Sequence, residues 1–296
     1  MKRWQALLAL FVIVVIWGTT FIVVHDATRQ WDTVAFVALR FLIASASVLP
    51  WALPELRRWR WADWRAGLLL GGLLFVGFVT QALGLSMTSA SRGGFLTGLN
   101  VVLVPLFSAA IWRERIRGQI WLGVALVVGG LWVLSRDAQP GQQASLLGDG
   151  LVLLCSAMFA GHIIAVGKLT KGRSMLALNA VQLSVVAVLA LGSSLVFEGV
   201  PSAPPAGIWW AALYLGVIAT ALIIGLQLAA QRVVSPTHTA LIFVLEPVFA
   251  ALFAIWFGDE HLSRLLLIGG GLMVAGIVLA EAPPIWRRAG EPVNET

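Results

Sequence analysis

The sequence predicts an all-α integral membrane protein with ten transmembrane helices, arranged as two inverted five-helix repeats with both termini in the cytoplasm. Three observations lead to this prediction. Hydrophobic residues make up 59% of the chain and charged residues 11%, whereas an ordinary soluble domain has roughly 25% charged residues. Apolar runs of the length that crosses a hydrocarbon core recur along the whole chain. The second half of the chain also repeats the first.

The apolar runs divide the chain into spans joined by short connections, which leave no room for a soluble domain. We expect helices, because backbone polar groups in lipid must be hydrogen-bonded internally and the alternating pattern of a β-barrel is absent. The first span exceeds the core of a typical signal peptide, so we expect it to be retained. The predicted spans are 7–24, 33–53, 66–86, 93–112, 119–135, 147–167, 174–197, 207–229, 237–257 and 264–281.

The internal repeat divides the chain into residues 1–140 and 141–296. Each half holds an odd number of spans, so the two copies must be inverted relative to each other in a bilayer, as in many secondary transporters. The glycines of spans five and ten stand seven residues apart, close to two helical turns, which predicts close helix packing. A shift of 146 residues places Trp64 over Trp210, Gln81 over Gln227, Asn100 over Glu246, Gly123 over Gly269 and Gly130 over Gly276.

The basic residues determine the predicted orientation. With the N-terminus inside, most Lys and Arg residues fall in inner segments, at 2–3, 57–65, 113–117, 168–173, 232 and 287–288. The outer segments hold only Arg29, Arg92, Arg136 and Arg264, and Arg40 lies inside span two. Such an excess on one side places both termini in the cytoplasm. The net charge of +6 therefore reflects topology and gives no reason to expect a nucleic-acid partner.

Several strings resemble the EamA-type members of the drug/metabolite transporter superfamily, over nearly the whole chain. The resemblance implies two five-helix repeats around a central cavity that opens alternately to the two sides, with helices four and nine among its walls. It also implies export of amino acids, their analogues, other small metabolites or toxic compounds. The strings are Trp17-Gly18, Leu39-Arg40-Phe41, Pro105 with Arg113-Glu114-Arg115, Leu245-Glu246-Pro247, and Gly258-Asp259-Glu260 followed by Gly269-Gly270-Gly271.

Charged residues at membrane depth are costly and need a partner or a cavity. Glu246 is the carboxylate placed well inside a span, before the helix-weakening Pro247. It could bind a proton or a solute amine, or it could pair with another polar group. Arg40 could bind a solute carboxylate through two hydrogen bonds, or it could be a structural cation paired with Glu246 or helix-end carbonyls. Gln182, its approximate repeat partner, is expected to form interhelical hydrogen bonds.

Uncharged polar residues provide the other candidates. Gln81 and Gln227 occupy equivalent positions in the two repeats. They could bind a zwitterionic or neutral solute, or each could form an interhelical hydrogen bond. Asn100 is equivalent to Glu246, and both are expected to face the cavity. Thr97, one turn before Asn100, shares its face. We therefore include these residues in the predicted solute-binding set.

Two histidines and one tryptophan complete the candidates. His162 in span six belongs to the predicted binding set, and His238 at the start of span nine to a structural or coupling set. Either could carry protons because imidazole titrates near neutrality, or could satisfy a local hydrogen bond. Trp17, late in span one, could stack on an aromatic or cationic solute. Most of the other tryptophans lie near span ends, as interfacial anchors do.

These features favour a secondary transporter in the cytoplasmic (inner) membrane that exports small polar metabolites, most plainly amino acids. The alternatives are an exporter of toxic hydrophobic cations or other metabolites, an intramembrane lipid-modifying enzyme and a passive channel. The chain contains no Gly-x4-Gly-Lys-Ser/Thr motif for ATP and no zinc or nucleophile-elbow motif for an enzyme. We expect no cofactor and no metal. The expected partners are a small-molecule solute and the lipid bilayer, and a monomer is compatible with the sequence.

Overall fold

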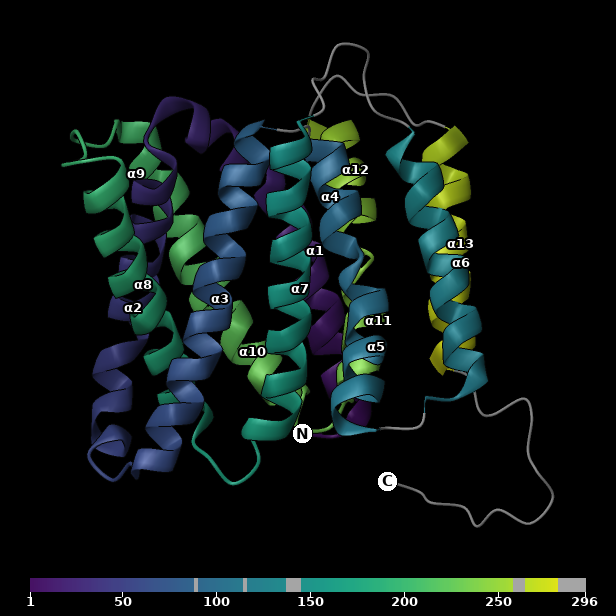
Figure 1. The fold of residues 1–296 in the computed structure, drawn as a ribbon, viewed down its shortest axis with the longest axis horizontal. Coiled ribbons are helices and arrows are strands. Elements are labelled where there is room, and N and C mark those ends of the chain that lie inside the picture. The colour runs from purple at the N-terminus through teal and green to yellow at the C-terminus, as the bar shows by residue number, and fades with distance from the viewer. Residues whose placement is uncertain (88–89, 114–115, 137–144, 258–263, 282–296) are drawn as a thin grey trace.

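The structure is a computed structural model that describes residues 1–87, 90–113, 116–136, 145–257 and 264–281, and every regular element in this part of the chain is a helix (Figure 1). The predicted motif residues at 114–115 and 258–263 lie outside the described residues. The helices are α1 (Arg3–Gln30), α2 (Thr33–Leu56), α3 (Trp61–Met87), α4 (Ala90–Gly98), α5 (Asn100–Trp112), α6 (Gly118–Ser135), α7 (Leu146–Leu169), α8 (Met175–Phe197), α9 (Ala206–Leu213), the π-helix η1 (Tyr214–Leu222), α10 (Ile223–Ala230), α11 (Pro236–Phe243), α12 (Glu246–Phe257) and α13 (Arg264–Glu281).

The long helices confirm an all-α membrane protein. Six helical segments are long and apolar enough to cross a bilayer, namely α1, α2, α3, α7, α8 and the continuous run Ala206–Ala230. The described residues also contain shorter apolar helices within 96–111, 118–133, 236–250 and 267–280. Each predicted span overlaps one helix or a run of consecutive helices. The chain is therefore a multi-pass membrane protein, and the number of its crossings stays a prediction.

Three of the predicted spans contain a local change of helix geometry that the sequence analysis did not anticipate. Span four divides at Leu99 into α4 and α5, and span nine divides at Val244 and Leu245 into α11 and α12. Pro247 has no amide proton to donate to Phe243, which accounts for the interruption in span nine. Span eight contains the π-helix η1. Asn100 and Glu246 consequently become the first residues of α5 and α12.

A glycine seam joins α6 to α13 at one edge of the molecule (Figure 1). A Cβ added at Gly123 would lie 2.7 Å from the carbonyl oxygen of Gly276, and one added at Gly130 would lie 2.5 Å from that of Gly269. The contacts run in opposite directions along the two helices, so α6 and α13 are antiparallel. The close packing predicted from the glycine spacing is thus confirmed.

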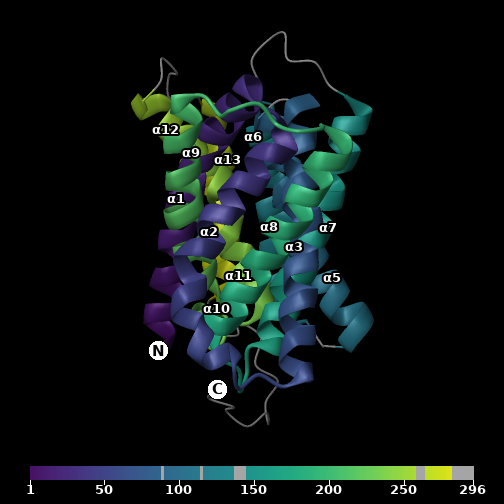
Figure 2. The same cartoon turned by 90° about the vertical axis from the view of Figure 1, so that its left-hand side faces the viewer.

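A second pair of antiparallel helices, α2 and α8, forms the opposite edge (Figures 1 and 2). Glu198, at the end of α8, accepts hydrogen bonds from the backbone amides of Val34 and Ala35 at the start of α2, both 2.9 Å long. At the other end of the pair, Ser174, the N-cap of α8, donates to Glu55 near the end of α2. Each helix therefore carries a glutamate that bonds the beginning of the other, where a negative charge is favoured.

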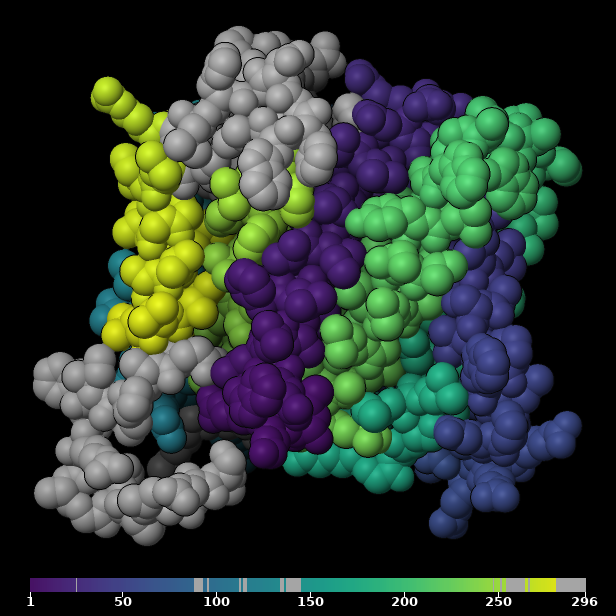
Figure 3. Space-filling model, turned by 180° about the vertical axis from the view of Figure 1, so that it is seen from behind, coloured from purple at the N-terminus to yellow at the C-terminus, as the bar shows by residue number. Residues whose placement is uncertain are grey.

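The remaining helices fill the space between these two edges. α1 crosses the surface beside α12 on one side and α9 to α10 on the other (Figure 3). We call the end of the molecule at which α1 begins the N-terminal end. There Leu10, Ile13 and Val14 of α1 are fully buried in a cluster with Ala230 and Ala240. This apolar cluster fills the space between α1, α10 and α11.

Candidate solute cavity

A cavity of about 60 Å³ lies between the central helices. Its lining on α1 runs from Trp17 to Val24, and on α3 from Leu74 to Leu85, so it extends from the middle of these helices away from the N-terminal end. The volume suits a few water molecules or a small part of a solute. The lining residues are Trp17, Thr20, Phe21, Val24, Arg40, Leu74, Phe78, Gln81, Leu85, Thr97, Asn100, Phe159, His162, Ile163, Ile224, Gln227, Phe243 and Glu246.

The structure brings the whole predicted solute-binding set to this one cavity. Trp17, Gln81, Thr97, Asn100, His162, Gln227 and Glu246 all belong to its lining. Arg40, predicted as a structural or coupling residue, lines it as well. Gln182 and His238 do not. Gln182 lies fully buried behind His162, and His238 lies at the start of α11, hydrogen-bonded to the N-cap Ser235.

The π-helix η1 holds the side chains of Trp17 and Arg40. Trp17 donates from Nε1 to the carbonyl oxygen of Ala219 at 2.9 Å, and its ring packs edge-on against Phe243 with centroids 5.0 Å apart. Arg40 donates from Nε to Thr220 Oγ1 at 2.7 Å, and its guanidinium carbon lies 4.8 Å from the centre of the Phe78 ring. Among the described residues Arg40 therefore hydrogen-bonds Thr220, and its charge also interacts with Glu246 in the same cavity lining.

His162 is connected to η1 by a chain of buried side chains. Its Nε2 lies 3.0 Å from Gln182 Oε1, Gln182 Nε2 donates to Asn179 Oδ1 at 3.2 Å, and Asn179 Nδ2 donates to the carbonyl oxygen of Ala221 at 2.8 Å. All three side chains are at most 4% exposed. Gln182 of α8 therefore forms an interhelical hydrogen bond, with His162 of α7 as the partner.

Gln227 begins a similar chain on the other side. Gln227 Nε2 donates to Gln231 Oε1 at 2.9 Å, and Gln231 Nε2 donates to the carbonyl oxygen of Ile163 at 2.8 Å. Both glutamines are buried. Gln81, the repeat equivalent of Gln227, has no hydrogen bond to any described residue, so the two repeats contribute chemically different amides to the cavity.

Asn100 and Thr97 leave polar atoms unsatisfied beside the cavity. Within the described part of the chain, Asn100 Oδ1 and Thr97 Oγ1 are buried and have no hydrogen-bond partner. An unsatisfied buried acceptor costs about 1–3 kcal/mol, so such an atom at a cavity wall favours the binding of a donor. Arg40 and Glu246 add a guanidinium group and a carboxyl group to the same lining.

Sequence analysis missed the residues behind the cavity wall. Thr220, Asn179 and Gln231 fix Arg40, His162 and Gln227, yet none of the three belongs to a recognisable motif. Polarity at membrane depth was the available signal. The phenylalanines of the lining, Phe21, Phe78, Phe159 and Phe243, were also not predicted. Among the described residues, no group of His, Cys, Asp and Glu is arranged to hold a metal ion.

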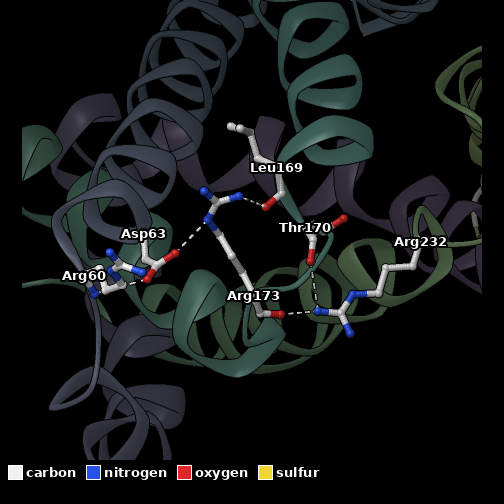
Figure 4. Close-up of polar contacts among 6 residues, drawn as sticks. All are labelled: Arg60, Asp63, Leu169, Thr170, Arg173 and Arg232. Carbon is white, nitrogen blue, oxygen red and sulfur yellow. Dashed lines mark hydrogen bonds and ion pairs between the residues drawn. The ribbon is translucent and has the colours of Figure 1, made fainter.

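A polar cluster covers the N-terminal end, joining the start of α3 to the connections after α7 and α10 (Figure 4). Arg173 forms an ion pair with Asp63 at 2.9 Å and donates to the carbonyl oxygen of Leu169 at 2.9 Å. Arg232 donates to the carbonyl oxygens of Thr170, at 3.0 Å, and Arg173. We call these residues the N-terminal latch. The latch and the apolar cluster both lie nearer to the N-terminal end than the cavity lining on α1 and α3 does.

Comparisons with known proteins agree with this architecture. An uncharacterised transporter of Archaeoglobus fulgidus is 28% identical over 94% of this chain and 86% of its own length. A protein of Escherichia coli K12 named "Probable amino-acid metabolite efflux pump" is 25% identical over 98% of both chains. A solved crystal structure superposes with a TM-score of 0.80 at 21% identity, covering 95% of this chain and 97% of the other.

The family comparison covers nearly the whole chain and accounts for both halves. The sequence model of the EamA-like transporter family matches it twice, at residues 4–136 and 146–281. The predicted resemblance to the drug/metabolite transporter superfamily is confirmed, and family membership indicates a transporter rather than an enzyme. The chain belongs to the EamA-like transporter family.

Proposed function

We propose that this protein is a secondary transporter that exports small polar metabolites, with amino acids or their analogues as the first class to test, by alternating access. The observation that carries the proposal is the cavity itself, where polar side chains from both halves of the chain converge. The N-terminal end beyond it is closed by apolar packing and by the latch. Such a cavity, closed on one side, is what a carrier needs in one of its two states.

We further propose that residues 1–140 and 141–296 are inverted repeats. Gly123 and Gly269 are equivalent by sequence, as are Gly130 and Gly276. The contacts pair Gly123 with Gly276 and Gly130 with Gly269, so exchanging the repeats reproduces the same two contacts. Equivalent helices that meet in this reciprocal way and run antiparallel are related by a twofold axis across the helices. This supports inverted five-helix repeats and ten crossings.

The proposed orientation places the N-terminal end in the cytoplasm. α1 begins and α13 ends at this end of the molecule (Figure 1). Basic residues gather at this end, at Arg57, Arg58, Lys168, Lys171 and Arg232. An excess of Lys and Arg favours the cytoplasmic side. The cytoplasmic end would then be the closed one, and the cavity would lie on its outer side. We propose that the chain acts in the inner membrane as a monomer, without nucleic acid or cofactor.

Counterflow into proteoliposomes tests the proposed function. Purified protein is reconstituted into vesicles preloaded with single unlabelled amino acids, and uptake of the labelled amino acid is compared with that of protein-free vesicles. We expect saturable counterflow for at least one class. Uptake that rises linearly with concentration would indicate a channel, and a chemically altered product would indicate an enzyme.

A second candidate class of solute is organic cations. Phe78, Phe159 and Phe243 line the cavity together with Trp17 and the carboxylate of Glu246, and aromatic faces attract cations. Including a quaternary ammonium compound in the same counterflow panel separates the two classes. Saturable exchange of the cation without exchange of any amino acid would favour this second function.

A further inference from the structure

Two series of hydrogen-bonded side chains lie behind the cavity and determine which groups of its wall accept hydrogen bonds. A backbone carbonyl oxygen can only accept hydrogen bonds, so the amide group of Asn179 that faces Ala221 must be its NH₂. Asn179 Oδ1 is then the acceptor for Gln182 Nε2, which leaves Gln182 Oε1 to face His162. The carbonyl oxygen of Ala221 thus determines the orientation of the side-chain amides of Asn179 and Gln182.

The orientation of Gln182 determines which nitrogen of His162 carries the proton. Gln182 Oε1 accepts, so His162 must donate from Nε2. In the neutral imidazole the other nitrogen, Nδ1, is then an acceptor. Nδ1 has no hydrogen bond to any described residue, and His162 lines the cavity. The hydrogen-bonded series from Ala221 to His162 therefore leaves His162 Nδ1 as an acceptor for the cavity.

The same reasoning applies to Gln227. The carbonyl oxygen of Ile163 requires the NH₂ of Gln231, so Gln231 Oε1 accepts from Gln227 Nε2. Gln227 Oε1 is then left as an acceptor for the cavity, beside the second N–H of Nε2. Asn100 Oδ1, which is buried and has no hydrogen-bond partner among the described residues, and the carboxyl group of Glu246 add acceptors to the same lining.

We propose that Asn179, Gln182 and Gln231 are positioning residues that hold His162 Nδ1 and Gln227 Oε1 as acceptors, so that the cavity binds the ammonium group of its solute. An ammonium group has three N–H donors and no acceptor. It matches these acceptors beside Glu246, and a group that only accepts hydrogen bonds does not. The guanidinium of Arg40 in the same lining is held by Thr220 and Phe78. This inference rests on the proposed carrier function and names the solute feature that the cavity recognises.

Solid-state NMR of the ¹⁵N-histidine-labelled protein in lipid tests the hydrogen-bonded series from Ala221 to His162 without any transport assay. The chain has four histidines, and His162→Gln identifies the His162 signals. We expect a protonated Nε2 and an unprotonated Nδ1. In Asn179→Leu the orientation of Gln182 is lost, and a second tautomer is expected to appear. Ser184→Ala, which removes a hydroxyl of α8 bonded to Ser45, is the control and should leave the tautomer unchanged.

Competition between unlabelled probes and the counterflow of a labelled solute tests whether the cavity recognises an ammonium group. The probes are phenylalanine, 2-phenylethylamine, which lacks the carboxylate, and 3-phenylpropionate, which lacks the ammonium group. We expect the two amines to compete and the acid not to. Because one hydrogen bond corresponds to about fivefold in an equilibrium constant, Asn179→Leu and Gln231→Leu should each raise the half-saturation concentration by about that factor, and Ser184→Ala should not.

The outcomes separate this inference from the proposed function. A protonated Nδ1 in the wild type, or an unchanged tautomer in folded Asn179→Leu, would overturn the positioning role whether or not the protein transports. Equal effects of the three probes, including no competition by any, would overturn the ammonium assignment. Failure of the wild type to exchange any solute would contradict the carrier function, while the tautomer measurement would still decide the role of Asn179 and Gln182.

Discussion

Asn100 and Glu246 illustrate how equivalent positions in a repeated sequence acquire different chemistry. Each is the first residue of a half-helix, α5 or α12, and each lines the cavity. In discontinuous membrane helices, half-helix ends are where transporters place polar solute contacts. The amide contributes an acceptor that is unsatisfied among the described residues, whereas Glu246 contributes a carboxyl group. Glu246 is thus the group of this pair that can exchange a proton with the cavity.

We predict that Glu246→Gln abolishes transport driven by a pH gradient and leaves equilibrium exchange measurable. The amide keeps the shape of the side chain but cannot bind and release a proton, so a coupled cycle cannot be completed. The measurement is accumulation of solute in proteoliposomes with an imposed pH gradient, beside exchange at equal pH. Glu198→Gln, which lies outside the cavity and retains an acceptor for α2, is the control. Unaltered dependence on the gradient in Glu246→Gln would remove the coupling role.

The helices show which features of the fold were accessible from sequence. Spans were predictable because lipid demands long apolar runs, and the α6–α13 seam was foreshadowed by the spacing of Gly123 and Gly130. The π-helix η1 was not, because a change from one hydrogen-bond register to another leaves no compositional trace in an apolar segment. The hydrogen-bonded series from Ala221 to His162 could not be predicted either, because its contacts depend on how α8 is rotated against η1.

We predict that Gly123→Ala destabilises the protein and Gly129→Ala does not. A Cβ at Gly123 would lie 2.7 Å from a backbone oxygen of α13, whereas one at Gly129 would have no neighbour within 4 Å. Overpacking of this kind costs about 1–3 kcal/mol. Because both glycines are on α6, the comparison cancels any difference in helix propensity. Thermal unfolding of the two variants in the same detergent measures the effect, and equal midpoints would contradict the seam as a tight contact.

At the scale of the whole molecule, two antiparallel pairs, α2 with α8 and α6 with α13, flank the helices that surround the cavity (Figure 1). Reciprocal glutamate bonds hold the first pair and reciprocal glycine contacts the second. The proposed repeat would account for this arrangement. The sequence could not predict which end is closed, because the latch pairs Asp63 with Arg173 across 110 residues, between segments that are not equivalent in the repeat.

The latch is expected to set the balance between the closed and open states of the N-terminal end. Its ion pair is about a quarter exposed, and pairs of this kind contribute about 0.2–1 kcal/mol. Asp63→Asn removes the charge while keeping an acceptor oxygen for the backbone amide of Arg60, which Asp63 also binds. The population with an open N-terminal end should therefore rise by up to about fivefold.

A cysteine in the apolar cluster behind the latch reports this opening. Cys155 is the one cysteine of the chain, so Cys155→Ser with Ile13→Cys gives a single thiol at a position that is fully buried in the closed end. In nanodiscs, where reagent reaches both faces, Asp63→Asn should increase the rate of maleimide labelling in proportion to the open population. Asp32→Asn, at the N-cap of α2 on the opposite end, should not. Equal labelling of the parent and Asp63→Asn would mean that apolar packing alone keeps this end closed.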